Sequence, residues 1–191
     1  MATTTRARTT IRDRRRHSEG HRQALIKYIK GDATSPQAAG PKLIIHIVNT
    51  LGAWGRGFVM SLSKRWPEPE QYYRRWHHDR RAALLPKRLD GRLEVTGDFA
   101  LGESQLVQVK PDTFVLNMVA QEGLRGGSKG PPIRYPALAM CLRHANRYAN
   151  DLGATVHGPR FGSGLAGGDW EKVAALVERL VTRPTTIYDF D

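Results

Sequence analysis

The sequence predicts an α/β fold built around buried strands, and two observations carry this prediction. Residues 43–48 form a near-continuous apolar run, which is typical of a strand buried on both faces. Residues 154–157 form a second β-like run, and both runs lead into a glycine loop followed by a helical pattern. Because ligands of open α/β sheets bind at the carboxyl ends of strands, the two loops predict a cleft for an extended phosphate ester.

Strands are expected where short β-like runs are bounded by turn residues, at residues 26–29, 43–48, 93–96, 105–110, 113–119, 154–157 and 186–190. The first strand is followed by a loop that proline and glycine interrupt, residues 32–42. Lys110-Pro111-Asp112-Thr113 has the composition of a hairpin turn. The two strands on either side of it are therefore expected to form a hairpin.

Helices are expected where apolar residues recur at helical spacing, at residues 58–65, 68–83, 135–151 and 170–181. Pro67 lies near the start of the second helix. Aromatic residues gather on one side of that helix and are interpreted as core: Trp66, Tyr72, Tyr73 and Trp76. Cys141 falls on the apolar stripe of the third helix and is interpreted as core packing rather than as a nucleophile.

The glycine loop after residues 154–157 is the most informative segment. It carries four glycines within residues 162–168, and a helical pattern follows it. Glycine lets the backbone turn sharply, and the N-terminus of a helix attracts anions. The segment therefore predicts a phosphate-binding loop, although a plain strand-to-helix connection capped by Asp169 fits the same residues. Neither glycine loop is a P-loop, and Met60 stands where a dinucleotide fingerprint would need its third glycine.

Length, charge and cysteine content narrow the class of protein. The 191 residues suit one domain, and no apolar run approaches the roughly 18 residues of a membrane span. The start lacks the apolar core of a secretory signal. A single cysteine excludes an internal disulfide and a cysteine-rich zinc site, and it suits a reducing, cytoplasmic compartment. We expect no metal, no cofactor and no membrane partner.

The formal net charge of +12 is concentrated in part at the start of the chain. Residues 1–22 hold seven arginines against Asp13 and Glu19, and they contain few large apolar residues. This composition predicts a disordered basic tail, which could attract nucleic acid without sequence preference or could be a solvated extension. The remaining positive charge would steer a polyanion towards the surface.

Several of these features together resemble a macrodomain. They are Lys30-Gly31-Asp32 after a short strand, Asn49 at a strand end, the loop at residues 52–57, and the segment at residues 162–170. The similarity runs from about residue 25 to residue 191, so the domain is expected to span 25–191. The resemblance implies a three-layer α/β/α fold around a central mixed sheet, with a cleft for ADP-ribose. It is strongest to the branch that holds ADP-ribose 1''-phosphate phosphatases and ADP-ribosyl-glutamate hydrolases.

The resemblance also implies roles for individual residues. Asp32 would accept a hydrogen bond from the adenine amino group beside Ala33, although it would look the same as a turn residue. Asn49 would hold the hydroxyls of the distal ribose, although it could simply cap a strand end. The remaining ligand contacts are assigned to the two loops. Gly55, Arg56 and Gly57 would wrap the distal ribose and its phosphate with Trp54 as a cover, Ser163, Gly164, Leu165 and Ala166 would surround the pyrophosphate, and Phe161 and Gly162 would lie beside them. Phe161 fits a core position as well as a lid.

Catalytic residues are harder to assign. The hydrolase branch uses a lysine nucleophile and an assisting aspartate, and the matching positions hold Gln121 and Ala166. Neither side chain can form a Schiff base or move a proton at neutral pH. Asp169 is a weak catalytic candidate with helix capping as its rival role, and His46 and His157 fit packed core positions. No acid–base pair follows from the sequence.

The sequence thus predicts a macrodomain that binds ADP-ribose or its derivatives and removes a substituent from the distal ribose. The reaction would remove the phosphate of ADP-ribose 1''-phosphate or cleave the ester that joins ADP-ribose to a protein side chain. The alternatives are a non-catalytic reader of ADP-ribosylated proteins and a basic module associated with nucleic acid.

Overall fold

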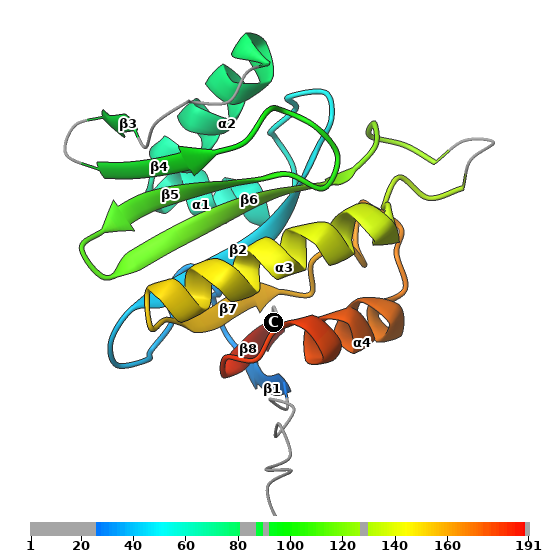
Figure 1. Ribbon diagram of the computed structural model, residues 1–191. Coiled ribbons are helices and arrows are strands. Elements are labelled where there is room, and N and C mark those ends of the chain that lie inside the picture. Colours follow the sequence, from blue (N-terminus) through cyan, green and yellow to red (C-terminus); the bar gives the residue numbers. More distant parts are fainter. Residues whose placement is uncertain (1–25, 81–86, 90–91, 127–129, 190–191) are drawn as a thin grey trace, which may run out of the picture.

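The computed structural model describes residues 26–80, 87–89, 92–126 and 130–189 (Figure 1). The predicted tail at residues 1–22 lies outside the described residues. Within these ranges the elements follow in this order: β1 (Ile26–Lys30), β2 (Lys42–Asn49), α1 (Phe58–Arg65), α2 (Glu68–Asp79), β3 (Lys87–Leu89), β4 (Arg92–Thr96), β5 (Ser104–Lys110), β6 (Thr113–Gln121), α3 (Tyr135–Asp151), β7 (Thr155–Pro159), α4 (Trp170–Leu180) and β8 (Thr185–Asp189).

The strands form one mixed sheet in the order β1-β8-β7-β2-β6-β5-β4-β3. The pairs from β1 to β6 are parallel, and the pairs from β6 to β3 are antiparallel. Lys110 pairs with Thr113, so the predicted hairpin turn is confirmed. The mixed sheet expected from the resemblance is confirmed as well.

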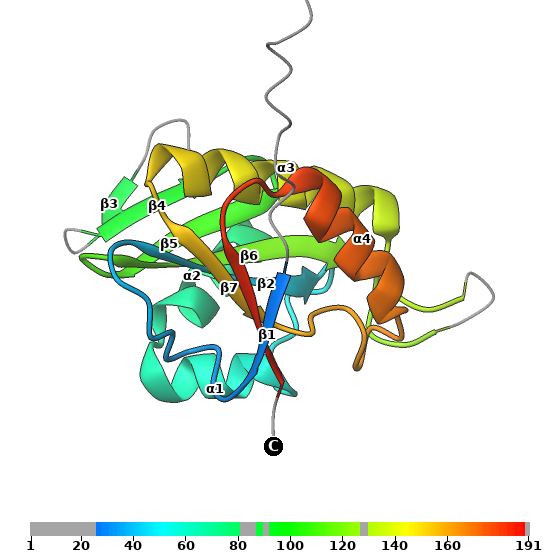
Figure 2. The ribbon, with the colours of Figure 1, turned by 90° about the horizontal axis from the view of Figure 1, so that it is seen from below.

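Side chains of β2 alternate between two hydrophobic cores, which makes the fold three layers deep. Leu43 and Ile45 point into the core under α3 and α4, whereas Ile44 and Val48 point into the core under α1 and α2. Figure 2 shows the two helix pairs on opposite faces of the sheet. Because both faces are covered, β2 can be apolar throughout, as its sequence indicated.

The aromatic residues of α2 and the thiol of α3 are buried, as predicted. Tyr73 and Cys141 have no exposed surface. Helix α2 is shorter than the predicted 68–83, because Arg80 adopts a left-handed φ of 58° and donates its N–H to the carbonyl of Trp76. Strand β3 was not predicted. Within the described residues, no helix combines the length and the apolar character needed to cross a membrane.

Candidate ligand-binding cleft

The cleft opens where two neighbouring strands diverge. Pairing between β2 and β7 stops at Ile44 and His157, and the chain beyond these residues borders a pocket of about 500 Å³. This volume suits a small-molecule ligand. The lining residues come from both strand ends and both glycine loops: His46, Ile47, Arg56, Gly57, Phe58, Val59, Ser61, Gln121, Pro159, Arg160, Phe161, Gly162, Gly164, Leu165 and Ala166.

Seven of the predicted site residues therefore line one pocket: Arg56, Gly57, Phe161, Gly162, Gly164, Leu165 and Ala166. Trp54, Gly55 and Ser163 belong to the same two loops but do not border it. The Ser163 hydroxyl donates to the carbonyl of Arg160 at 2.8 Å, so this side chain closes its own turn. Phe161 is both core and pocket wall, since it is 4% exposed and packs edge-on against Trp170.

Asn49 shapes the first loop from within. Its Oδ1 accepts the backbone N–H groups of Leu51 at 2.9 Å and Ala53 at 3.1 Å, and its Nδ2 donates to the carbonyl of Ala53 at 2.7 Å. The side chain is buried and does not line the pocket. The arrangement favours the alternative of a strand-end cap over direct contact with a ribose.

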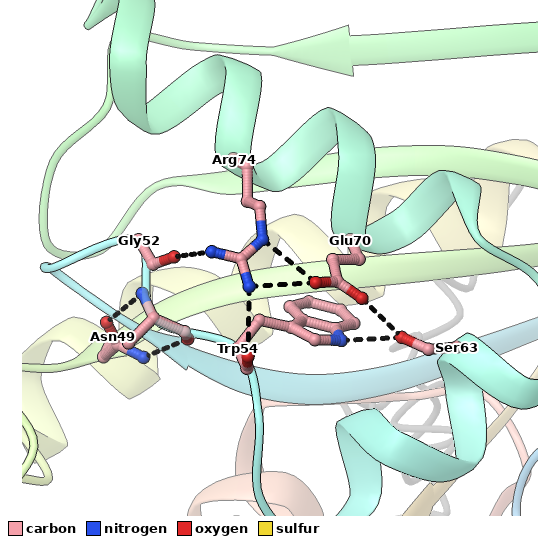
Figure 3. Close-up of polar contacts among 7 residues, drawn as sticks. Asn49, Gly52, Trp54, Ser63, Glu70 and Arg74 are labelled. Atoms are coloured by element: carbon pink, nitrogen blue, oxygen red, sulfur yellow. Dashed lines mark hydrogen bonds and ion pairs between the residues drawn. The ribbon is translucent and has the colours of Figure 1, made fainter.

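Side chains of helix α2 fix the same loop through hydrogen bonds (Figure 3). Arg74 donates to the carbonyls of Gly52 at 3.2 Å and Trp54 at 3.1 Å. An ion pair of 2.9 Å between Arg74 Nη2 and Glu70 Oε1 fixes the guanidinium in this position. The indole N–H of Trp54 donates to Ser63 Oγ at 2.8 Å, and Ser63 in turn donates to Glu70 at 2.8 Å. Trp54 is 8% exposed, so its ring packs in the core and does not line the pocket.

The loop delivers the N-terminus of α1 to the pocket. Gly57 occupies the N-cap position with a φ of 76°, and no side chain caps this end of the helix. Phe58 and Val59 in the first turn line the pocket. The first N–H groups of a helix lack partners within it, and they favour an anionic group. Arg56 adds a full positive charge on the same wall.

The second loop is compact because its glycines are in close contact. Gly162 has a φ of 83°, and a Cβ on Gly168 would lie 2.5 Å from the carbonyl oxygen of Gly162. The N–H of Gly168 donates to that carbonyl at 2.8 Å. These contacts require glycine at both positions. Gly164, Leu165 and Ala166 of this loop line the same pocket as the first turn of α1.

Arg160 is a pocket residue that the sequence analysis did not single out. Its guanidinium bonds to both carboxylate oxygens of Asp189 and lies 5.1 Å from the ring of Tyr28 and 5.4 Å from that of Trp170. The hydrogen bonds to Asp189 raise its pKa further. Arg160 is therefore a fixed cation that lines the same pocket as Arg56. Its partners are distant in sequence, so no local signal could have identified it.

Asp32 borders a second cavity, and Ser61 on α1 lines both this cavity and the main pocket. Its Oδ1 accepts the N–H of Thr34 at 2.8 Å, and Arg65 lies 3.7 Å from its Oδ2. Asp32 is thus a turn residue and also a cavity-lining carboxylate. Ala33 beside it is 3% exposed.

The candidate catalytic groups have other partners or no titratable proton. Asp169 caps α4, with Oδ1 accepting the N–H of Glu171 at 2.9 Å, and it does not line the pocket. His157 lies between Thr155 and Tyr188, and burial lowers its pKa to about 4. Gln121 does line the pocket and donates to the carbonyl of Gly123 at 2.9 Å. Among the described residues no cluster of metal-binding side chains occurs.

Comparison with known proteins defines the family. A macrodomain protein from Streptomyces coelicolor is 42% identical, and the match covers 86% of this chain and 98% of that structure, with a TM-score of 0.70. The chain therefore belongs to the macrodomain family. A search of protein-family models returned no match.

The chain covers very different shares of two curated relatives. The mouse protein "Chromodomain-helicase-DNA-binding protein 1-like" is 31% identical over 177 residues, which are 86% of this chain but 18% of that protein. An "ADP-ribose 1''-phosphate phosphatase" from Lodderomyces elongisporus is 23% identical, over 87% of this chain and 99% of that protein. The chain thus spans less than a fifth of the mouse relative and nearly all of the yeast one.

Proposed function

We propose that this macrodomain binds ADP-ribose or an ADP-ribose derivative in the cleft between β2 and β7. The observation that carries the proposal is the pocket of about 500 Å³ between the uncapped N-terminus of α1 and the second glycine loop, with Arg56 and Arg160 on its walls. A central pyrophosphate would meet backbone donors and two cations there. The adenine would occupy the adjoining cavity, where the Asp32 carboxylate can accept from its amino group.

An enzymatic activity would remove a substituent from the distal ribose, as the name of the Lodderomyces relative suggests. Among the described residues that line the pocket, none is a carboxylate or a lysine. A hydrolase of this composition would rely on a water molecule positioned by the ligand's phosphates or by a nearby side chain. The same observation favours a second candidate function, a non-catalytic reader of ADP-ribosylated proteins.

Calorimetric titration of ADP-ribose tests binding, with Gly164→Val as the variant. Gly164 lines the pocket, a Cβ there meets no atom within 4 Å, and its φ is not left-handed, so the fold should tolerate the change. We expect micromolar binding by the wild type and a loss of about tenfold or more in the variant, or about 1.4 kcal/mol. Ala175→Val on the exposed side of α4 is the control and should bind normally.

The absence of both heat and thermal shift with millimolar ADP-ribose would overturn the proposal. Incubation of the wild type with ADP-ribose 1''-phosphate then separates the two functions. Release of phosphate would establish a phosphatase, whereas tight binding without release would exclude that activity and favour the reader.

A further inference from the structure

A further cavity, of about 230 Å³, lies at the end of α1 that is remote from the main pocket. The main pocket borders the first turn of α1, whereas this cavity borders Arg65, the last residue of the helix, and Lys42, the first residue of β2. The turn between β5 and β6 also lines it, through Lys110, Asp112 and Thr113, and we call it the hairpin cavity.

Positive charge from three separate segments meets in the hairpin cavity. Lys42 comes from the start of β2, Arg65 from the end of α1 and Lys110 from the end of β5. Among the lining residues, all of which the structure describes, Asp112 is the one carboxylate, so the lining has an excess of two positive charges. Because like charges repel, an anion between them would be stabilised.

The carboxylate of the hairpin cavity already has its own cation. Lys42 Nζ donates to Asp112 Oδ2 at 2.6 Å and to the carbonyl of Gly40 at 2.8 Å, and its side chain is 13% exposed. The hydrogen bond from Lys42 lowers the pKa of Asp112. The hydroxyl of Thr113 donates to the other carboxylate oxygen at 2.9 Å. Asp112 therefore neutralises Lys42 and leaves the other two cations of the lining without a partner from this cavity.

These two cations lie against one indole. Arg65 Cζ is 5.7 Å and Lys110 Nζ is 5.9 Å from the centroid of the Trp66 ring, which is held in the core at 7% exposure. An aromatic ring at this distance attracts a cation and restrains its position. Among the described residues Lys110 forms no ion pair, and Arg65 forms a loose one of 3.7 Å with Asp32, which does not line the hairpin cavity.

The size and the neutral groups of the hairpin cavity indicate the class of ligand. A volume of about 230 Å³ is below the roughly 300 Å³ at which pockets for drug-sized ligands begin, so a small group suits it. Ser35 Oγ accepts from Gln37 Nε2 at 3.4 Å, and its own proton has no acceptor among the described residues. A phosphate group is small, carries up to two negative charges and offers several acceptor oxygens to such donors.

We propose that the hairpin cavity is an anion site that binds a phosphate group between Arg65 and Lys110, separately from the cleft for ADP-ribose. The hydroxyl of Ser35 donates to the bound group. The ligand is inorganic phosphate or the phosphate ester of a small molecule, since both present the same oxygens. The proposal does not depend on the proposed function and stands even if the cleft binds no ADP-ribose.

Nitrogen–proton NMR of the labelled protein, titrated with inorganic phosphate, locates the site. We expect the amide resonances of Ser35, Gln37 and Thr113 to shift together, with a dissociation constant in the millimolar range, and not to shift with chloride at equal ionic strength. Resonances of cleft residues such as Gly164 report separately on any phosphate that binds there.

Lys110→Gln should weaken phosphate binding at the hairpin cavity about tenfold, because a charged donor is lost. Lys172→Gln is the matched control: Lys172 is also exposed, and its ammonium also lies 5.9 Å from an aromatic ring, that of Tyr135, but it does not line the cavity. It should bind phosphate as the wild type does. Ribose 5-phosphate distinguishes the two sources, since tighter binding than that of inorganic phosphate would identify an ester and weaker binding the free ion.

Shifts confined to cleft residues, or no shift with millimolar phosphate, would overturn the inference. Equal shifts with chloride would mean general screening and would overturn it as well, as would an equal loss of affinity in the two lysine variants. The shift pattern of the wild type decides the matter even if Lys110→Gln does not fold. ADP-ribose binding is measured apart from all these outcomes, so failure of this inference leaves the proposed function untouched.

Discussion

Tyr73 on α2 donates a hydrogen bond of 2.6 Å to the backbone carbonyl of Asn49, the last residue of β2. The same hydroxyl lies 3.2 Å from Asn49 Oδ1, the atom that organises the first glycine loop. Burial raises the pKa of the Tyr73 phenol well above its ordinary value, so the hydroxyl remains a donor. Helix α2 thereby fixes the point at which the loop leaves the sheet.

Replacement of Tyr73 by phenylalanine should destabilise the protein by about 1 to 2 kcal/mol, because the buried carbonyl of Asn49 loses its donor. Urea denaturation measures the change, which should appear as a lower midpoint with an unchanged slope. Tyr148→Phe is the control, since the Tyr148 hydroxyl makes no hydrogen bond to any described residue. Equal stability of the two variants would contradict this account of the loop.

Asp32→Ala should weaken ADP-ribose binding about tenfold or more, because the adenine amino group would lose its charged acceptor. Calorimetry measures the effect. Asp151→Ala is the control: it also removes one carboxylate from an exposed position, but at the far end of α3, and it should bind as the wild type does. Unchanged binding by Asp32→Ala would place the adenine elsewhere.

Much of the fold could be predicted from the sequence because local signals and tertiary structure agree. The helices at 58–65 and 135–151 have the predicted bounds. The end of α2 could not be predicted, because the residues after Asp79 are ordinary helix formers and only the backbone of Arg80 reveals the stop. Strand β3 could not be predicted either, because it is only three residues long and is recognised as a strand through its pairing with β4.

The candidate site was only partly predictable, for a different reason. Both glycine loops were identified, since glycine at a strand end is a local signal. The burial of His46 was also predicted correctly from the apolar run around it. Whether His46 lines the pocket depends on where β7 diverges from β2, and no local sequence pattern predicts that point. Trp54 is a different case: the resemblance implied a cover over the ribose, whereas its indole bonds to Ser63 and packs in the core.

Acidification should destabilise the protein through two buried histidines. Burial lowers the pKa values of His46 and His157 to about 4, below their ordinary value of 6.5. Between those values the unfolded chain binds protons that the native protein does not. The stabilisation is therefore complete above pH 6.5 and is lost as the pH falls towards 4, by at most about 3 kcal/mol for each histidine.

Urea denaturation at roughly pH 7, 5.5 and 4.5 measures this loss. His157→Gln should flatten the decline by removing one of the two protonation sites that favour unfolding. The control is His78→Gln, because the His78 side chain is 88% exposed and its replacement should leave the slope unchanged. Parallel declines in wild type and His157→Gln would show that other groups govern the acid sensitivity.

The thiol of Cys141 should be unreactive in the native protein. It lies on the buried face of α3 without exposed surface, with Sγ 3.4 Å from the carbonyl oxygen of Glu103, and burial raises its pKa to about 12. At about pH 8 the native thiol carries almost no thiolate, which is the reactive form, whereas an unfolded cysteine is partly ionised. Absorbance with a disulfide reagent should rise by one equivalent only after urea is added. Prompt labelling without denaturant would mean that the core beneath α3 opens on the timescale of the assay.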